Sequence, residues 1–69
     1  MINYTPFWNT LKKSKESTYT LIHHHGISPT TIQRLRKNQG VNTNTINDLC
    51  KILHCDIPDI IAYIPEEEN

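Results

Sequence analysis

The segment from Thr18 to Lys37, TYTLIHHHGISPTTIQRLRK, decides the fold of this chain. Its pattern predicts two short helices that are joined at Gly26. Ser17 or Thr18 caps the first helix, because a hydroxyl oxygen can accept hydrogen bonds from the free N–H groups of the first turn. Gly26 ends this helix, since glycine readily adopts the left-handed backbone that a sharp helix exit needs.

The second helix of this segment is predicted to carry a polar face. Ser28 and Pro29 start it, since a serine oxygen caps free N–H groups and proline fits the first turn. At about 100° per residue, Ile32 and Leu35 share one side of the helix. The opposite side carries a polar stripe: Thr30, Gln33, Arg34 and Lys37. A cationic, hydrogen-bonding helix face is what reading base edges in the DNA major groove requires, and a solvated face without a partner is the alternative.

The size and composition of the chain restrict its class. Its 69 residues allow one domain, and 36% apolar residues with only two glycines favour an ordered helical fold. The longest apolar run, Ile60 to Ala62, is far shorter than the roughly 18 residues of a membrane helix, and no export signal is visible. We therefore expect a cytoplasmic protein in which Cys50 and Cys55 are reduced and pack as small apolar side chains.

The formal net charge is zero, but the charges are divided along the chain. Residues 1–40 hold six basic residues against Glu16 alone, a net charge of +5. Residues 41–69 hold Lys51 against six acidic residues, a net charge of −5. Because fields are screened over about 8 to 10 Å, a neutral domain polarised in this way can still bind phosphates through one end. Ordinary surface lysines and a solvated acidic tail are the alternative.

Cap and periodicity patterns predict three further helices and no sheet. One helix, nearest the N-terminus, covers about residues 5–13, with Thr5 as its cap. Thr43 or Asn44 caps a fourth helix that continues to Leu53, whose apolar residues follow the spacing of a half-buried helix. A short fifth helix is expected from Ile57 to about Tyr63, because an aspartate capping box precedes it.

Two groups of residues contain potential metal ligands: His23 to His25, and Cys50, His54 and Cys55. Consecutive histidines on a helix point about 100° apart and cannot converge on one ion, so they are expected near the negative end of the helix dipole. Cys50 and His54 share a helix face, but a tetrahedral site needs a fourth ligand. We therefore expect no metal and no cofactor.

The helix pair, followed by a capped helix and a short closing helix, resembles the helix-turn-helix domain of the Cro and phage-repressor family, also called the XRE family, in its small stand-alone form. The residues that match its spacing are Leu21-Ile22, Gly26-Ile27-Ser28, Thr31-Ile32, Leu35, Leu49 to Leu53 and Asp56-Ile57. Two positions depart from the family pattern, since Ile22 stands where alanine is usual and His25 stands where an apolar residue is usual. The resemblance implies an all-α, compact five-helix, lambda-repressor-like domain over residues 1–65 and an acidic tail over residues 66–69.

The same resemblance implies roles for individual residues. Those that would read bases are Pro29, Thr30, Gln33 and Arg34. An arginine can bind guanine O6 and N7, a glutamine can bind adenine N6 and N7, and a proline can contact a thymine methyl group. Those that would bind DNA phosphates are Thr18, Lys37, Asn38, Thr43 and Asn44. Backbone N–H groups at a helix start also suit an anion.

The leading hypothesis is a sequence-specific, double-stranded-DNA-binding transcriptional regulator, a repressor that inserts the helix from Ser28 to Lys37 in the major groove.

Ile60 and Ile64 are expected to face inward, while an exposed patch at Ile61 and Tyr63 would join a homodimer. A monomer with incidental surface apolar residues is the alternative. The rival hypothesis is a protein-interaction module, antitoxin-like or an anti-repressor subunit, that uses the acidic half. No nucleophile–base pair or phosphate-binding glycine loop is visible, so no enzyme and no small-molecule substrate are expected.

Overall fold

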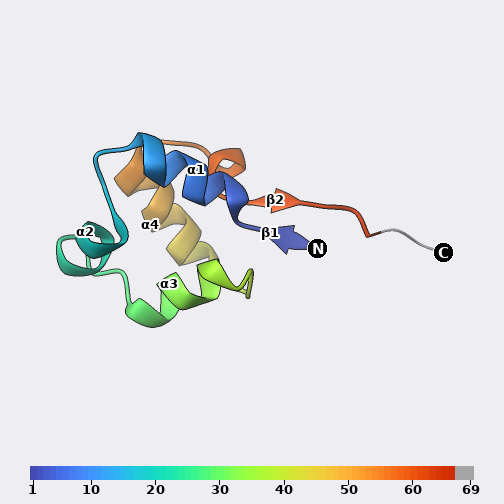
Figure 1. Cartoon of the computed structure of the whole chain (residues 1–69), viewed down its shortest axis with the longest axis horizontal. Helices are drawn as coiled ribbons and strands as arrows, with labels where there is room; N and C mark the ends of the chain where they lie inside the picture. The colour runs from blue at the N-terminus through green and yellow to red at the C-terminus, as the bar shows by residue number, and fades with distance from the viewer. Residues whose placement is uncertain (67–69) are drawn as a thin grey trace.

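Four α-helices form the body of the computed structural model, and a short antiparallel ribbon projects from it (Figure 1). The structure describes residues 1–66. In chain order the elements are β1 (Ile2–Asn3), α1 (Thr5–Lys13), α2 (Thr18–His23), α3 (Pro29–Arg36), α4 (Thr43–Leu53), the 3₁₀ turn η1 (Ile57–Asp59) and β2 (Ala62–Tyr63). The two strands pair with Ile2 opposite Tyr63 and Asn3 opposite Ala62, so they bring the first residues and the residues after η1 side by side.

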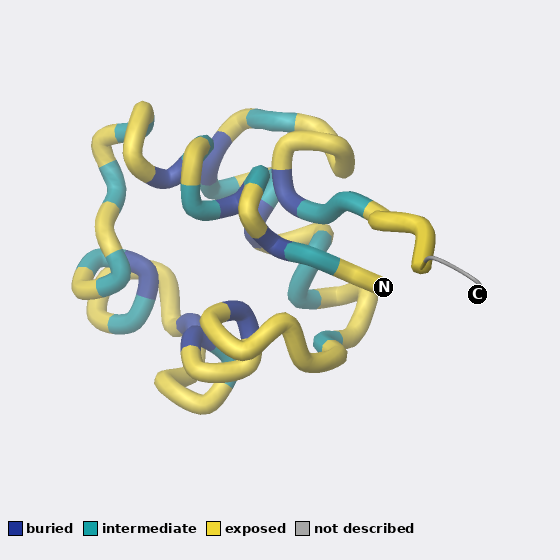
Figure 2. The backbone as a smooth tube through the Cα atoms, turned by 45° about the vertical axis from the view of Figure 1, so that its right-hand side comes forward, coloured by how far each residue is buried: buried dark blue, intermediate teal, exposed yellow. Residues whose placement is uncertain are grey.

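Each helix contributes its apolar side to one core. The fully buried side chains include Phe7 of α1, Leu21 of α2, Leu35 of α3 and Leu49 of α4. Figure 2 shows these buried stretches turned toward the interior, whereas the connecting segments are mostly exposed. Burial of apolar surface is the main driving force for such a small fold, and the described core contains no buried polar residue.

The predicted signals for the helices on either side of the Gly26 turn are confirmed. Ser17 caps α2 and forms a capping box with Thr20, because each side chain accepts a hydrogen bond from the other residue's backbone N–H. Gly26 has a φ of +74°, the left-handed backbone predicted there. Ser28 caps α3 through the N–H of Thr31, and Pro29 lies in the first turn. Short-range rules therefore position the start of α3.

The caps predicted for two other helices are wrong by one or two residues. The residue before α1 is Tyr4, which has no capping side chain; Thr5 lies inside the helix and its N–H donates to Oδ1 of Asn3. Tyr4 takes this place because its ring is buried in the core and its hydroxyl donates to the carbonyl of Gln39. Asn42, rather than Thr43 or Asn44, caps α4, since its Oδ1 accepts the N–H of Thr45 at 2.8 Å.

The expected fifth helix is also wrong, and within residues 1–66 the fold is mostly helical with a small ribbon instead of all-α. The aspartate capping box forms, but it starts only the 3₁₀ turn η1. The chain then extends because β2 pairs with β1, which lies at the other end of the sequence. Ile60 is fully buried as predicted, whereas Ile64, predicted to face inward, is 46% exposed.

Of the acidic tail expected over residues 66–69, only Glu66 lies within the described residues, 4.0 Å from the Met1 ammonium group. Cys50 and Cys55 are free and half-buried against the core, and burial raises the pKa of the Cys55 thiol to about 11. Within residues 1–66, no helix has the length and apolar character needed to span a bilayer.

Candidate nucleic-acid interface

The face of α3 that the sequence predicts to be polar is exposed. Ile32 and Leu35 are 4% and 0% exposed and attach the helix to the core. The side chains predicted to read bases, together with Lys37, are all exposed: Pro29, Thr30, Gln33, Arg34 and Lys37. The buried pair fixes the rotation of the helix, so the polar stripe is presented by a packed element instead of a loop.

Arg34 does not extend freely into solvent. Its Nη1 donates a hydrogen bond to the carbonyl oxygen of Gly40 at 3.2 Å. The two residues line a recess of about 350 Å³ between α3 and the start of α4. Thr31 and Thr45 also line this recess. Because a guanidinium group carries five N–H donors, the bond to Gly40 leaves others for a ligand.

Arg36 lies on another side of α3 and was not among the residues predicted for the site. Its Cζ atom lies 5.2 Å from the centre of the Trp8 ring on α1. The Trp8 ring in turn packs edge-on against the buried Phe7 ring, with centroids 4.8 Å apart. The charge of Arg36 was visible in the sequence, but no local pattern pairs α1 with the end of α3.

The residues predicted to bind phosphates lie at three helix ends. Thr18 begins α2, Lys37 and Asn38 follow α3, and Thr43 and Asn44 form the first turn of α4. Lys37, Thr43 and Asn44 are exposed, while Thr18 is half-buried. Asn38 has a structural contact, since its Oδ1 accepts the N–H of Tyr4 at 3.0 Å and its φ is 55°. Its side-chain oxygen is therefore committed to the fold.

The single acidic residue among residues 1–40 does not neutralise this surface. Oε1 of Glu16 accepts a hydrogen bond from the Thr20 hydroxyl at 2.7 Å and lies 3.1 Å from Nε2 of His25. The hydrogen bond from Thr20 and the neighbouring His25 lower the pKa of the Glu16 carboxyl. In the described part of the chain, the salt bridges involve His25 and the Met1 ammonium group, and no lysine or arginine.

The two positions that depart from the family pattern are accommodated without disturbing the turn. Ile22 is half-buried and packs against the core. His25 is exposed and contacts Glu16 instead of entering the core. Among residues 1–66, no group of three His, Cys, Asp or Glu side chains is arranged to hold a metal ion.

The exposed α3 that follows the Gly26 turn, packed on α1, α2 and α4, defines a helix-turn-helix domain. The chain belongs to the Cro/C1-type helix-turn-helix DNA-binding domain family, whose model (HTH_26) matches residues 7–66. It is similar to a solved structure described as the crystal structure of transcriptional regulator VanUg, Form II, with 31% sequence identity and a TM-score of 0.83. That match covers 94% of this chain and 87% of the other chain. No curated protein matches the chain.

Proposed function

We propose that this protein is a transcriptional regulator that binds double-stranded DNA sequence-specifically and places α3 in the major groove. The observation that carries the proposal is the exposed polar stripe of α3, held in one orientation by the buried Ile32 and Leu35. The family of the chain and the transcriptional regulator VanUg, to which it is similar, support the same function. The α-helix is an element that the width of the major groove accommodates.

In this proposal four residues read bases: Pro29, Thr30, Gln33 and Arg34. Arg34 reads guanine, because the N–H groups that remain beside its bond to Gly40 can donate to both O6 and N7. Gln33 can form a bidentate contact with adenine, and Pro29 offers only an apolar contact to a thymine methyl group. The hydrogen bond to Gly40 limits the positions that Arg34 can reach, which favours one base pair over its neighbours.

Residues at the helix ends hold the phosphates in this proposal. Lys37 supplies a charge, and the exposed Thr43 and Asn44 lie beside the N–H groups of the first turn of α4. Thr18 occupies the corresponding place at the start of α2. Asn38 contributes through its amide N–H₂ group, because its oxygen already accepts the N–H of Tyr4. These contacts set the position of α3 without reading sequence.

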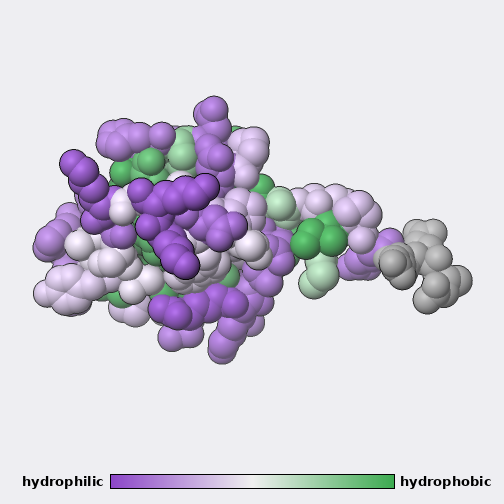
Figure 3. Space-filling view, turned by 45° about the horizontal axis from the view of Figure 1, so that its top comes forward, coloured by the Kyte–Doolittle hydropathy of each residue, from purple (hydrophilic) through white to green (hydrophobic). Residues whose placement is uncertain are grey.

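We further propose that the protein represses by occupying an operator as a homodimer joined at the Ile61 and Tyr63 region. Tyr63 is 68% exposed and Met1 is 57% exposed, and Figure 3 shows hydrophobic side chains on the projecting ribbon. Ile61, which was predicted to be exposed, is instead half-buried and packs against the core. Met1 and Ile64 exchange both of their backbone hydrogen bonds, so the N–H and C=O of Tyr63 point to the open edge of β2. A two-fold pair would place two copies of α3 about 34 Å apart, one turn of DNA.

Selection of bound fragments from random duplex DNA, followed by sequencing, tests this function. Enrichment of one motif supports it, and two copies of the motif about one helical turn apart support the dimer. Absence of any enriched motif and of any binding to duplex DNA at low salt contradicts it. Recovery of one stoichiometric protein partner under those conditions would instead favour the protein-interaction module.

A further inference from the structure

Trp8 forms a fixed platform for a cationic side chain. The ring is half-buried and contacts Phe7, which is fully buried, so the core fixes its orientation. Arg36 lies over this ring, with its Cζ atom 5.2 Å from the ring centre. This contact leaves N–H donors of the guanidinium group available to an anion, because the group carries five of them.

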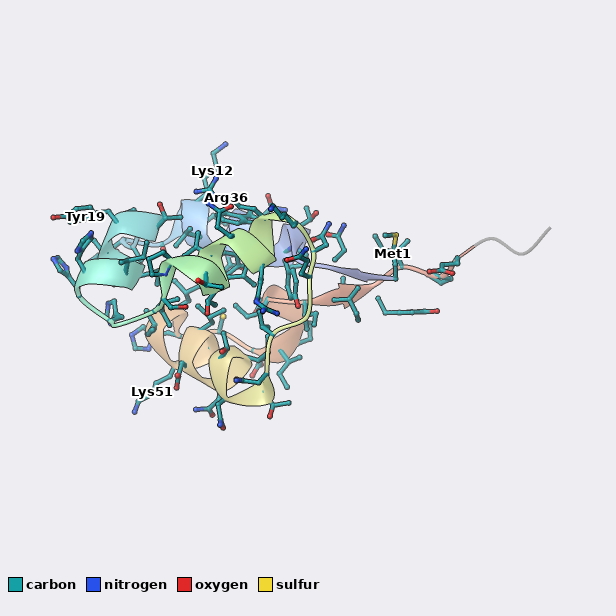
Figure 4. The ribbon with its side chains drawn as sticks, turned by 90° about the horizontal axis from the view of Figure 1, so that it is seen from below. Met1, Lys12, Tyr19, Arg36 and Lys51 are labelled. Atoms are coloured by element: carbon teal, nitrogen blue, oxygen red, sulfur yellow. The ribbon has the colours of Figure 1, made fainter. Side chains whose placement is uncertain are left out.

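A second cation projects from the same face of α1 as Trp8. Lys12 follows Trp8 by four residues in α1, so both side chains project from the same face of that helix. Figure 4 places Lys12 and Arg36 at the same edge of the molecule and Lys51 at the opposite edge. Figure 3, which turns the α1 side forward, shows hydrophilic side chains across the middle of the body. We call Trp8, Lys12 and Arg36 the α1/α3 basic edge.

Within residues 1–66, neither cation of the α1/α3 basic edge forms a salt bridge with a carboxylate. Glu16 is the single acidic residue among residues 1–40, and its carboxylate contacts Thr20 and His25. Two exposed cations beside an aromatic ring, without an acidic partner, favour a ligand that supplies the negative charge. Lys12 and Arg36 also lie in the last turns of their helices, where a cation is stabilised by the helix dipole. That role alone predicts an effect on folding stability and none on ligand binding.

We propose that the α1/α3 basic edge is a second phosphate-binding surface, which holds the DNA backbone beside the groove that α3 enters. This inference rests on the proposed function and adds residues that lie outside the polar stripe of α3. Arg36 follows Arg34 by two residues, so the two side chains project about 200° apart around the helix. Arg36 therefore contacts the backbone, not the bases that Arg34 reads, and Trp8 acts as its positioning residue.

The salt dependence of binding to a mixed-sequence 20-bp duplex tests the inference without knowledge of the operator. A labelled duplex is titrated with the parent protein and with the variants K12Q, R36Q and K51Q at several KCl concentrations, and fluorescence anisotropy gives each binding constant. Each phosphate contact contributes about 0.9 to the slope of log K against log salt. K12Q and R36Q are expected to lower the magnitude of that slope by about 0.9 each. The matched control K51Q removes the same charge at the opposite edge and is expected to leave the slope unchanged.

The outcomes separate this inference from the function on which it rests. Equal slopes for the parent, K12Q and R36Q would overturn the inference while the proposed function stands. Equal losses in all three variants would also overturn it, because they would report net charge instead of a site. If the parent binds no duplex, the proposed function fails and the inference fails with it. Thermal unfolding of each variant, followed by circular dichroism, verifies that the proteins compared are folded.

Trp8 provides an independent readout, because it is the single tryptophan of the chain. A phosphate that binds Arg36 changes the surroundings of the ring beneath it, so duplex DNA is expected to change the tryptophan fluorescence of the parent. The change is expected to be smaller in R36Q and unaltered in K51Q. The same change in the parent and R36Q at saturating DNA would contradict contact at this edge.

Discussion

Arg34 and Arg36 belong to one helix, yet the two flanks of α3 hold them in different ways. On one flank, Arg34 donates a hydrogen bond to the carbonyl of Gly40, beside the start of α4. On the other, Arg36 lies over the ring of Trp8 on α1 and makes no salt bridge within residues 1–66. The first contact is a hydrogen bond from one N–H donor of the guanidinium group, whereas the second is a cation–π contact with a ring whose centre lies 5.2 Å from Cζ.

In the proposed function, this difference would separate two kinds of recognition on one short helix. A hydrogen bond fixes a direction, which suits a side chain that must discriminate between base edges. A cation–π contact holds the charge near the ring and leaves N–H donors available, which suits a phosphate that accepts hydrogen bonds from several directions. Neighbouring cations on one helix can therefore serve sequence reading and backbone binding without competing for one ligand.

Leu35→Ala is expected to have the largest effect, because it removes the buried side chain that fixes both flanks of α3. The loss of apolar contacts and the resulting cavity should lower the free energy of unfolding by about 2 to 5 kcal/mol. Chemical denaturation followed by circular dichroism measures this change. The matched control Gln33→Ala changes an exposed residue of the same helix and should alter stability little; equal losses in both variants would contradict this packing.

Arg34→Ala is expected to act on sequence reading. Binding to the selected DNA motif should weaken by about 1 to 3 kcal/mol, with relaxed preference at one base pair. Titration of the motif and of variants with single base-pair changes measures both quantities. R36Q serves as the control, because it should weaken binding to all duplexes by a similar factor. Preserved specificity in Arg34→Ala would show that the base-reading assignment is wrong.

Asn38→Ala is expected to loosen the junction between the end of α3 and the start of α1. Asn38 has a left-handed backbone, and its side chain accepts the N–H of Tyr4. Left-handed backbone costs an ordinary residue roughly 1 to 2 kcal/mol, and the lost hydrogen bond adds about 0.5 to 1.5 kcal/mol. Asn38→Gly tolerates the backbone and loses only the hydrogen bond, so thermal unfolding should rank it between the parent and Asn38→Ala. An Asn38→Gly variant less stable than Asn38→Ala would contradict this explanation.

Glu16→Gln is expected to give the smallest effect, a loss of stability that is present at neutral pH and disappears at acidic pH. Hydrogen bonding lowers the pKa of Glu16 in the folded state below its ordinary value of 4.5. Its contribution to stability is therefore present above pH 4.5 and is lost as the pH falls through the folded pKa. Melting temperatures measured from pH 7 downward should fall less steeply at acidic pH in Glu16→Gln than in the parent. Identical pH profiles for the two proteins would contradict this contribution.

The parts of the fold that the sequence predicted well depend on neighbours along the chain. The cap at Ser17, the left-handed Gly26 and the start of α3 at Ser28 involve residues within one or two helical turns. Prediction was less accurate where a distant partner decides the local structure. Tyr4 displaces Thr5 as the residue before α1 because its ring enters the core and its hydroxyl contacts Gln39.

For the candidate site, the sequence predicted which face of α3 is exposed but not which residues contact its two arginines. Helical periodicity placed the polar stripe of α3 on the exposed face, because Ile32 and Leu35 are apolar and spaced for one side of a helix. Periodicity could not reveal that Arg34 bonds to Gly40 or that Arg36 lies over Trp8. Both contacts depend on the packing of α3 against other segments.

The sequence by itself determined α2, the Gly26 turn and the exposed face of α3, because caps, left-handed glycine and helical periodicity are local properties of the backbone. The tertiary structure alone decided that residues after η1 extend and pair with the first residues of the chain, and that the two flanks of α3 meet different partners. The physical reason is that strand pairing and ring–cation contact join residues far apart in sequence, whose encounter depends on how the whole core packs.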